Sequence, residues 1–528
     1  MLTGNSHARG RRIRVTFVAL LCVGFGLFAG GGEAAPTKPK ISWSKCYAQF
    51  GPFQCGTVQV PLDYDQRGGA AISIAVVRLP ATDPARRIGS LFLNPGGPGG
   101  SGVDFTVFAG PFLYTDEVRA RFDLVGFDPR GIMRSKAFRC FGTPKQWEPY
   151  FTPFAFPMTP EQEQIWIAAD RYLIDACDRR GGEIGDHMAT ANVARDLDVL
   201  RQAVGDAKLT YAGYSYGSYL GVTYANLFPA NVRALVVDGV LDPIAWSTGR
   251  GSEAATLPFS TRLRSDAGAQ ATLNEFFRLC DAGGDACAFA GDSAVRYRRL
   301  ADRLLAEPLV ITHPDGSVEV IDYSILVAIT LGHMYDSFTW PELAAILADL
   351  EARAGTAALA AEARAARQQR AMFITKRGFP HYPNFVEGGP AVFCADSDNP
   401  SSYAAWSSAG AAADAAFGYF GRIWTWISSP CAAWTYGDTD RYMGPFNRRT
   451  ASPVLVVGTQ FDPATRYEGA LTVAGLLPNS ALLTVHGWGH TSLFLSQCAD
   501  AAVSRYLLEV TTPAAGTVCE QDEVPFSG

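Results

Sequence analysis

The sequence predicts an α/β protein whose mostly parallel sheet is covered by helices on both faces and interrupted by a mainly helical insertion. Short, nearly all-apolar runs alternate with stretches of helical spacing, and each run ends at a turn rich in Gly, Pro or Asp. Strands that are apolar on both faces are typical of a parallel sheet between two helical layers. The predicted strands are 72–79, 90–94, 122–127, 209–212 and 234–238, followed near the C-terminus by 453–458 and 481–485.

The insertion is predicted from a change of texture between these two groups of strands. Residues 340–373 are rich in Ala, Leu and Arg with helical spacing, and an aromatic-rich piece follows after stretches broken by Pro and Gly. A βα unit needs about 30 residues, and the segment between the two groups of strands is much longer, so it predicts an inserted cap. Residues 36–60, before the first group, look like a lead-in to the core. The predicted organisation is a signal peptide at 1–35, core at 36–243, helical cap at 244–450 and core again at 451–528.

Length and charge narrow the class of function. The chain has 528 residues, of which 48% are hydrophobic and 18% charged, as expected for a globular core with an added domain. Its 45 basic and 51 acidic residues give a net charge of −6, and no run of Lys or Arg stands out. A nucleic-acid partner is therefore not expected.

The N-terminus resembles an export signal. A basic front precedes an uncharged stretch at 15–30, and small residues around 32–34 offer a cleavage site. The apolar stretch is short for a spanning helix, so we expect an exported protein, periplasmic or released to the medium, without a stable membrane anchor. A retained anchor is the alternative. The basic residues are Arg9, Arg11, Arg12 and Arg14.

Cysteine usage agrees with export. Of the 11 cysteines, Cys22 lies in the predicted signal, which leaves an even number for an oxidising compartment. Their order suggests pairing between neighbours, although sequence alone leaves the connectivity open. No Cys-x-x-Cys occurs, and no metal site is predicted. The expected pairs are Cys46–Cys55, Cys140–Cys177, Cys280–Cys287, Cys394–Cys431 and Cys498–Cys519.

The strongest chemical signal is the pentapeptide Gly213-Tyr-Ser215-Tyr-Gly217. An apolar strand enters it and a helical stretch leaves it, which is the setting of a nucleophile elbow rather than of an ordinary Gly-rich turn. Such a turn exposes the serine hydroxyl at the carboxyl edge of the sheet. Ser215 is therefore the predicted nucleophile, and the Tyr216 amide is a predicted donor to the oxyanion.

A second glycine-rich run, Asn94-Pro-Gly-Gly-Pro-Gly-Gly-Ser-Gly102, follows an earlier strand. Its backbone can pass close to a substrate carbonyl, so it is predicted to supply the second oxyanion amide, from Gly97 or, failing that, from Gly96. A phosphate-binding loop lacks support because the Lys and Ser/Thr of a Walker sequence are missing. A plain surface loop is the remaining alternative.

Two late loops supply candidates for the acid and the base. Asp462 follows the strand at 453–458, and His490 follows the next strand. The chain order Ser, Asp, His is the order used when the nucleophile sits on an elbow of this kind. His486 is the rival base; His490 is preferred because Gly489 lets the loop turn the ring inward. Each residue alone has an ordinary structural explanation, as a turn aspartate or a core histidine.

Together these motifs resemble those of the secreted tripeptidyl-aminopeptidase branch of the prolyl-aminopeptidase serine peptidases, which have the α/β-hydrolase fold. One departure is Asn192, where an Asp is expected before Arg195. The resemblance implies a Ser-His-Asp serine exopeptidase without a cofactor. Members are also named carboxylesterases, so an esterase is one alternative and a catalytically inactive binding protein is another. The segments that carry the resemblance are 94–102, 127–131, 213–217, 238–242 and 489–491.

The resemblance also implies that the substrate has a free N-terminus. Asp396 and Asp398 lie in an irregular stretch of the predicted cap that begins at Cys394. A Cys394–Cys431 link would hold that stretch in place, so both carboxylates are predicted candidates for binding the substrate ammonium. The alternative is that both are solvated turn residues. The expected substrate is a peptide or a small ester; the residue preference, the number of residues released and the oligomeric state stay open.

Overall fold

The structure is a computed structural model that describes residues 39–66, 68–312, 318–355 and 382–527. The predicted signal peptide at 1–35, with Cys22, lies outside these residues, as does the end of the predicted helical stretch at 340–373. Among the helices that are described, none is both long enough and apolar enough to cross a membrane.

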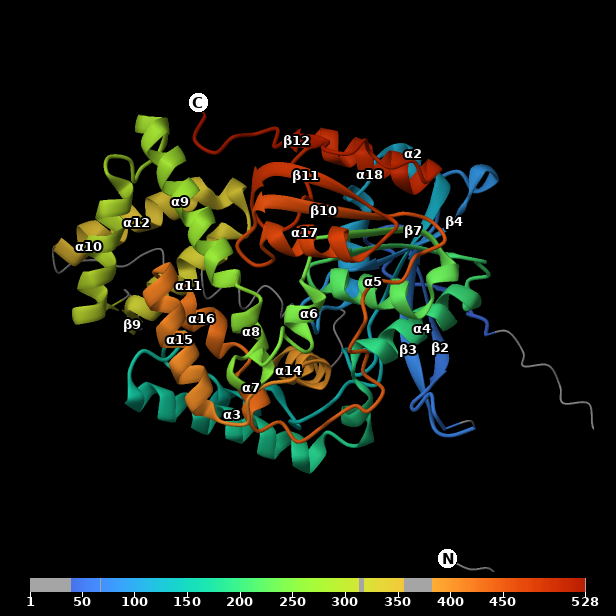
Figure 1. Cartoon of the computed structure of the whole chain (residues 1–528), viewed down its shortest axis with the longest axis horizontal. Coiled ribbons are helices and arrows are strands. Elements are labelled where there is room, and N and C mark those ends of the chain that lie inside the picture. Colours follow the sequence, from blue (N-terminus) through green and yellow to red (C-terminus); the bar gives the residue numbers. More distant parts are fainter. Residues whose placement is uncertain (1–38, 67, 313–317, 356–381, 528) are drawn as a thin grey trace, which may run out of the picture. The chain divides into compact units, whose positions relative to one another are not determined.

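A ten-stranded sheet forms the centre, in the order β1-β2-β3-β5-β4-β6-β7-β10-β11-β12 (Figure 1). From β5 to β12 neighbouring strands are parallel, and β1, β2 and β3 add an antiparallel edge. The predicted α/β fold with a mostly parallel sheet is therefore confirmed. The strands are β1 (Ser44–Lys45), β2 (Gln54–Pro61), β3 (Ala71–Leu79), β4 (Gly89–Asn94), β5 (Phe122–Phe127), β6 (Leu209–Tyr214), β7 (Val232–Asp238), β10 (Val454–Phe461), β11 (Ser480–Trp488) and β12 (Val518–Glu520).

Helices cover both faces of this sheet, because alternate residues of each central strand point to opposite sides. In β4, Leu91 and Leu93 belong to an apolar cluster that includes residues of α1, α2 and α18, whereas Phe92 belongs to a cluster that includes residues of α4, α5 and α17. All six residues of β4, β5 and β6 are buried, which explains why these strands have nearly uniform apolar sequences. The covering helices are α1 (Gly102–Phe108), α2 (Asp116–Arg121), α4 (Thr190–Ala203), α5 (Tyr216–Leu227), α17 (Tyr467–Leu476) and α18 (Gln497–Glu509).

Two strands, β1 and most of β2, lie where the sequence indicated only a lead-in. β2 alternates buried and more exposed residues at its C-terminal end, since its position near the sheet edge leaves one face partly open to solvent. A search for continuous apolar runs therefore misses it.

Between β7 and β10 the chain is mainly helical, as predicted, and builds a separate apolar core from α9 to α12. It also contains a small antiparallel pair, β8 (Leu309–Thr312) with β9 (Val318–Ile321). The helices are α6 (Pro243–Trp246), α7 (Glu253–Thr256), α8 (Phe259–Arg262), α9 (Ser265–Gly283), α10 (Ser293–Ala306), α11 (Tyr323–Met334), α12 (Trp340–Gly355), α14 (Phe385–Asp396), α15 (Tyr403–Phe417) and α16 (Gly421–Trp426).

A long helix from the N-terminal half, α3 (Pro160–Arg180), packs against this inserted segment. Trp166 Nε1 donates a hydrogen bond to Ser429 Oγ, and Glu163 forms an ion pair with Arg422 at 3.2 Å. Part of the predicted 36–243 core segment thus contacts the insertion, and the cap boundaries of 244–450 stay a prediction.

The structure joins the ten cysteines outside the signal in the five expected pairs. Cys140–Cys177 and Cys394–Cys431 each close a sequence separation of 37, whereas Cys280–Cys287 closes a separation of 7. A cross-link stabilises more when it closes a longer loop, because it removes more entropy from the unfolded chain.

Removal of Cys140–Cys177 by paired alanine substitutions should lower the free energy of unfolding by about 2–4 kcal/mol. The matched removal of Cys280–Cys287 should cost about 1.5 kcal/mol less, because its loop is shorter. Denaturant unfolding of the two variants and the wild type measures both values. Equal stability of all three proteins, or two or more titratable thiols in the native protein, would contradict this expectation.

Candidate active site

The elbow around Ser215 lies between β6 and α5. Ser215 has φ 56° and ψ −126°, a left-handed conformation that is unusual for a residue with a side chain. Its amide donates to the Asp238 carbonyl at 2.9 Å. A Cβ atom on Gly213 would lie 2.2 Å from the Gly217 carbonyl oxygen, and one on Gly217 would lie 2.6 Å from the Asn94 oxygen. Both glycines are thus required for the close packing of the turn.

The glycine-rich loop after β4 lies against this elbow. A Cβ atom on Gly96 would lie 2.8 Å from the Tyr216 amide nitrogen and 3.0 Å from the Ser215 Cβ. The Gly96 amide donates to Asn94 Oδ1 at 3.0 Å, so it is already engaged. This favours Gly97, the next residue, as the second oxyanion donor beside Tyr216. Positive φ values at Gly96, Gly97 and Gly99 explain the repeated glycines.

Asp462 and His490 are in direct contact. His490 Nδ1 lies 3.0 Å from both carboxylate oxygens of Asp462, and Thr465 Oγ1 donates to Asp462 Oδ2 at 2.8 Å. The amides of Ala464 and Thr465 donate to Oδ1 at 2.8 Å, and the Thr491 amide donates to Oδ2 at 3.1 Å. The acid is thus fixed by four donors besides the imidazole.

The charges of this pair are set by opposing effects. Burial would raise the pKa of Asp462, but His490 and the donated hydrogen bonds outweigh it and hold that pKa below its ordinary value. Burial would lower the pKa of His490, but the carboxylates of Asp462 and Asp238 raise it above its ordinary value. The arrangement favours an ionised acid beside an imidazole that can accept a proton.

The end of β7 connects the elbow with the histidine. Asp238 accepts the Ser215 amide, and a Cβ atom on the following residue, Gly239, would lie 3.4 Å from His490 Cε1. The His490 amide donates to the Tyr335 carbonyl at 2.8 Å, and the Tyr335 ring lies 5.0 Å from the imidazole. Ser215 follows β6, and Asp462 and His490 follow β10 and β11, so the three residues lie at the same edge of the parallel sheet, and their catalytic roles stay predictions.

His486, the rival base, lies elsewhere. It is part of β11, its side chain is 40% exposed, and its Nδ1 atom is 2.5 Å from Glu520 on β12. This pairing at the surface favours His490 as the base.

Asp396 is the last residue of α14 and is only 2% exposed. Its carboxylate accepts the Thr190 amide at 2.7 Å, the Thr190 hydroxyl at 2.6 Å and Trp246 Nε1 at 3.2 Å. The Thr190 hydroxyl is also hydrogen-bonded to the Tyr216 hydroxyl. Asp396 therefore supports the residue after the nucleophile, a connection that sequence reasoning missed. Burial raises the pKa of this carboxyl to about 7.

Asp398 lies in a more open position. Its side chain is 42% exposed and forms an ion pair with Arg441 at 2.7 Å. A partly exposed carboxylate of this kind is accessible to a ligand, whereas the oxygens of Asp396 are already occupied by protein donors. The ammonium-binding role of both residues stays a prediction.

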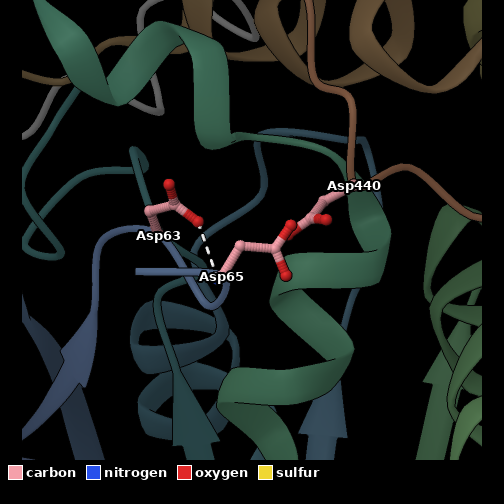
Figure 2. Close-up of side chains that lie close together, drawn as sticks. All are labelled: Asp63, Asp65 and Asp440. Carbon is pink, nitrogen blue, oxygen red and sulfur yellow. Dashed lines mark hydrogen bonds between the residues drawn. The ribbon is translucent and has the colours of Figure 1, made fainter. Parts of the chain in front are cut away.

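A group of three carboxylates lies apart from these residues. Oxygen atoms of Asp63, Asp65 and Asp440 lie within 4.8 Å of one another, and the Asp65 amide donates to Asp63 Oδ1 at 2.8 Å (Figure 2). Arg195 lies 3.5 Å from Asp440 and already supplies a positive charge. A partly exposed acidic cluster that is paired with an arginine carries no metal assignment by itself.

Comparisons with known proteins bear on both the fold and the chemistry. A family model described as TAP-like protein matches residues 416–519, and one described as alpha/beta hydrolase fold matches residues 89–277. Carboxylesterase B of Mycobacterium tuberculosis is 34% identical over 519 residues, covering 93% of this chain and 92% of that protein. Serine protease Hip1 of the same organism is 31% identical over 529 residues, covering 95% and 96%.

Two further comparisons extend this set. Tripeptidyl aminopeptidase of Streptomyces lividans is 30% identical over 507 residues, covering 93% of this chain and 89% of that protein. Among solved structures, a hydrolase from Pseudomonas aeruginosa PA01 aligns with a TM-score of 0.34 and 12% identity, covering 86% of this chain and 98% of that one.

Proposed function

Since the chain belongs to the TAP-like family of serine hydrolases with the α/β-hydrolase fold, we propose that it is an exported exopeptidase that cleaves peptides near a free N-terminus. The observation that supports the hydrolytic part is the elbow of Ser215, which the end of β7 connects to the loop where His490 contacts Asp462. In this arrangement Ser215 is the nucleophile, His490 is its base and Asp462 is the acid that orients the base.

Ser215 Oγ attacks the scissile carbonyl carbon while His490 Nε2 takes the hydroxyl proton. Asp462 holds the proton of Nδ1, so that Nε2 is the acceptor, and stabilises the imidazolium that forms. The amides of Tyr216 and Gly97 donate to the oxyanion, and each such donor lowers the barrier by about 3 kcal/mol.

The tetrahedral intermediate then breaks the bond to the leaving amine, which receives the proton from His490 Nε2. The product is an acyl-enzyme on Ser215, and the released amine carries the C-terminal part of the peptide. Water, deprotonated by the same imidazole, attacks the acyl carbon and regenerates the Ser215 hydroxyl.

The preference for a free N-terminus rests on the relatives and on the acidic groups of the inserted segment. One relative is named tripeptidyl aminopeptidase, and Asp396 and Asp398 lie at the end of α14 and just beyond it. The Cys394–Cys431 bond ties α14 to the 3-10 turn Ser429–Ala432, so the segment that carries both residues is held. A carboxylate held near the site can select an ammonium, because a blocked substrate leaves it without a partner.

N-acetylation of a short peptide amide should lower kcat/KM by at least about 30-fold, which corresponds to an unpaired buried acid. Asp398→Asn should narrow this difference if Asp398 binds the ammonium, and Asp396→Asn should do so if Asp396 does. Chromogenic aminoacyl, dipeptidyl and tripeptidyl amides, free and acetylated, measure it. Equal rates on free and acetylated peptides would remove the exopeptidase proposal, and a preference that survives both substitutions would place the ammonium site elsewhere in the inserted segment.

A carboxylesterase is the second candidate, since one relative at 34% identity is named carboxylesterase B. The same three residues hydrolyse an ester by the same steps, with an alcohol as leaving group. Simple esters beside the peptide panel separate the two, because a serine peptidase cleaves both esters and peptide amides whereas an esterase cleaves the esters and leaves the peptide amides intact. An inactive binding protein disagrees with the presence of Ser215, Asp462 and His490 at the same edge of the sheet.

The proposed export rests on the predicted signal and the five disulfides. Such bonds persist in oxidising compartments, which fits a peptidase of the periplasm or the medium.

A further inference from the structure

Asp238 lies between the strand of the nucleophile and the strand of the catalytic acid. It is the last residue of β7, and it pairs in register with Tyr214 of β6 on one side and with Val457 of β10 on the other. Ser215 follows Tyr214 directly, and Asp462 follows the end of β10. The backbone of this residue is therefore at the centre of the candidate active site.

The main chain of Asp238 contacts the nucleophile. Its carbonyl oxygen accepts the Ser215 amide at 2.9 Å. Ser215 has a positive φ, a conformation that persists only where neighbouring contacts hold it. This hydrogen bond is one of those contacts, and it does not depend on the side chain at position 238.

The side chain of Asp238 contacts the loop of the base. The Ser492 amide donates to its two oxygens at 3.0 and 3.1 Å, and the Ser492 hydroxyl donates to Oδ2 at 2.7 Å. Two residues earlier in the same loop, His490 binds Asp462, and the Thr491 amide donates to Asp462 Oδ2. In this loop His490 and Thr491 thus bind one buried carboxylate, Asp462, and the next residue, Ser492, binds the other, Asp238.

The carboxylate of Asp238 interacts electrostatically with His490 and Asp462. The titratable groups around it are His490 and Asp462 together with Tyr114 and Tyr214, whose hydroxyls share a hydrogen bond of 2.7 Å. Burial raises the pKa of Asp238 to about 6, although the Ser492 donors oppose it, so the carboxyl is ionised above that pH. Around His490 the charged groups are Asp462 and Asp238, and the Tyr335 ring contacts the imidazole in a T-shaped arrangement.

We propose that Asp238 is a positioning residue of the active centre, which holds the His490 loop through Ser492 and supplies a second anion that stabilises the imidazolium. This role rests on the proposed function of His490 as the base. Asp462 orients the ring by direct contact, whereas Asp238 acts through the loop and through its charge.

The test replaces the charge while keeping the shape. In Asp238→Asn the remaining oxygen can still accept the Ser492 amide, and the new amide group can donate to the Ser492 hydroxyl. The matched control is Asp242→Asn in the same Asp238-Gly-Val-Leu-Asp242 segment. Asp242 caps α6 and pairs with Arg250, and asparagine is also a good N-cap.

The acid limb of the kcat/KM profile reports the base in the free enzyme. In wild type the anions raise the pKa of His490, so activity is present above that pKa and is lost as the pH falls through it. Loss of one anion destabilises the imidazolium, so the limb of Asp238→Asn should move to lower pH by about 0.5 pH unit. Its kcat on the alkaline plateau should fall by about 10-fold with KM changed less than about 3-fold, while Asp242→Asn keeps the wild-type limb. An Asp238→Asn limb at the wild-type pH would overturn the proposal.

Ser492→Ala provides the second arm, because it keeps the carboxyl group and removes one donor to it. We expect a lower kcat on the alkaline plateau, where Asp238 is ionised in both proteins. If Asp238→Asn does not fold, an unchanged kcat of Ser492→Ala overturns the positioning role. Failure of the proposed function and failure of this inference give different results. An active His490→Ala variant would contradict the role of His490 as the base. An inactive His490→Ala variant together with a wild-type pH profile for Asp238→Asn would contradict only the role of Asp238.

Discussion

Ser215→Ala is expected to lower kcat by about 10,000-fold or more on every substrate class, because the acyl-enzyme cannot form without the hydroxyl. The change removes a single oxygen atom, and the Ser215 amide keeps its hydrogen bond to Asp238. We therefore expect the melting temperature to stay within a few degrees of the wild-type value. Turnover of chromogenic amides and esters, measured with thermal unfolding of the same preparation, checks both statements.

Retained turnover by a folded Ser215→Ala variant would contradict the assignment of the nucleophile. It would also show that the elbow is not the site of the reaction, because the turn and its glycines keep their geometry without the hydroxyl.

His490→Ala and Asp462→Asn should each lower kcat by about three to four orders of magnitude. The first removes the base. The second leaves a neutral acceptor that no longer stabilises the imidazolium and that favours the wrong tautomer. Steady-state kinetics at the alkaline plateau of the wild-type profile measures these losses.

His486→Ala is the matched control for the histidine. It removes the same side chain four residues earlier, from a site where the imidazole pairs with Glu520 at the surface, so kcat should stay within about 3-fold of wild type. A reversal, with His486→Ala inactive and His490→Ala active, would show that the base had been assigned to the wrong loop position.

The local motifs could be predicted from the sequence because their geometry depends on adjacent residues. At the elbow, atoms of the same turn and of the neighbouring loop leave no room for a side chain at Gly213 or Gly217, so both positions require glycine and the motif is visible in the sequence. The central strands could be predicted for a similar reason. Strands buried on both faces have uniformly apolar sequences, whereas β2 near the sheet edge does not.

The supporting contacts could not be predicted because they join residues far apart in the chain. Asp396 binds Thr190 across 206 positions, and Asp238 binds Ser492 across 254. Both aspartates stood out in the sequence, the first beside Cys394 and the second at the end of a predicted strand. Their buried contacts depend on how distant segments pack, which the sequence does not show. For Asp396 the sequence therefore suggested only an ammonium-binding role.

The central claim is that Ser215 is an activated nucleophile in the native protein. A fluorophosphonate probe tests it most directly, because such a reagent phosphonylates, with loss of fluoride, only a serine whose proton is removed by a neighbouring base. Peptide mapping by mass spectrometry after labelling of the native protein should find one adduct, on the peptide that contains Ser215, and His490→Ala should abolish it. Absence of labelling in the native wild type, or an adduct on a different serine, would contradict the account.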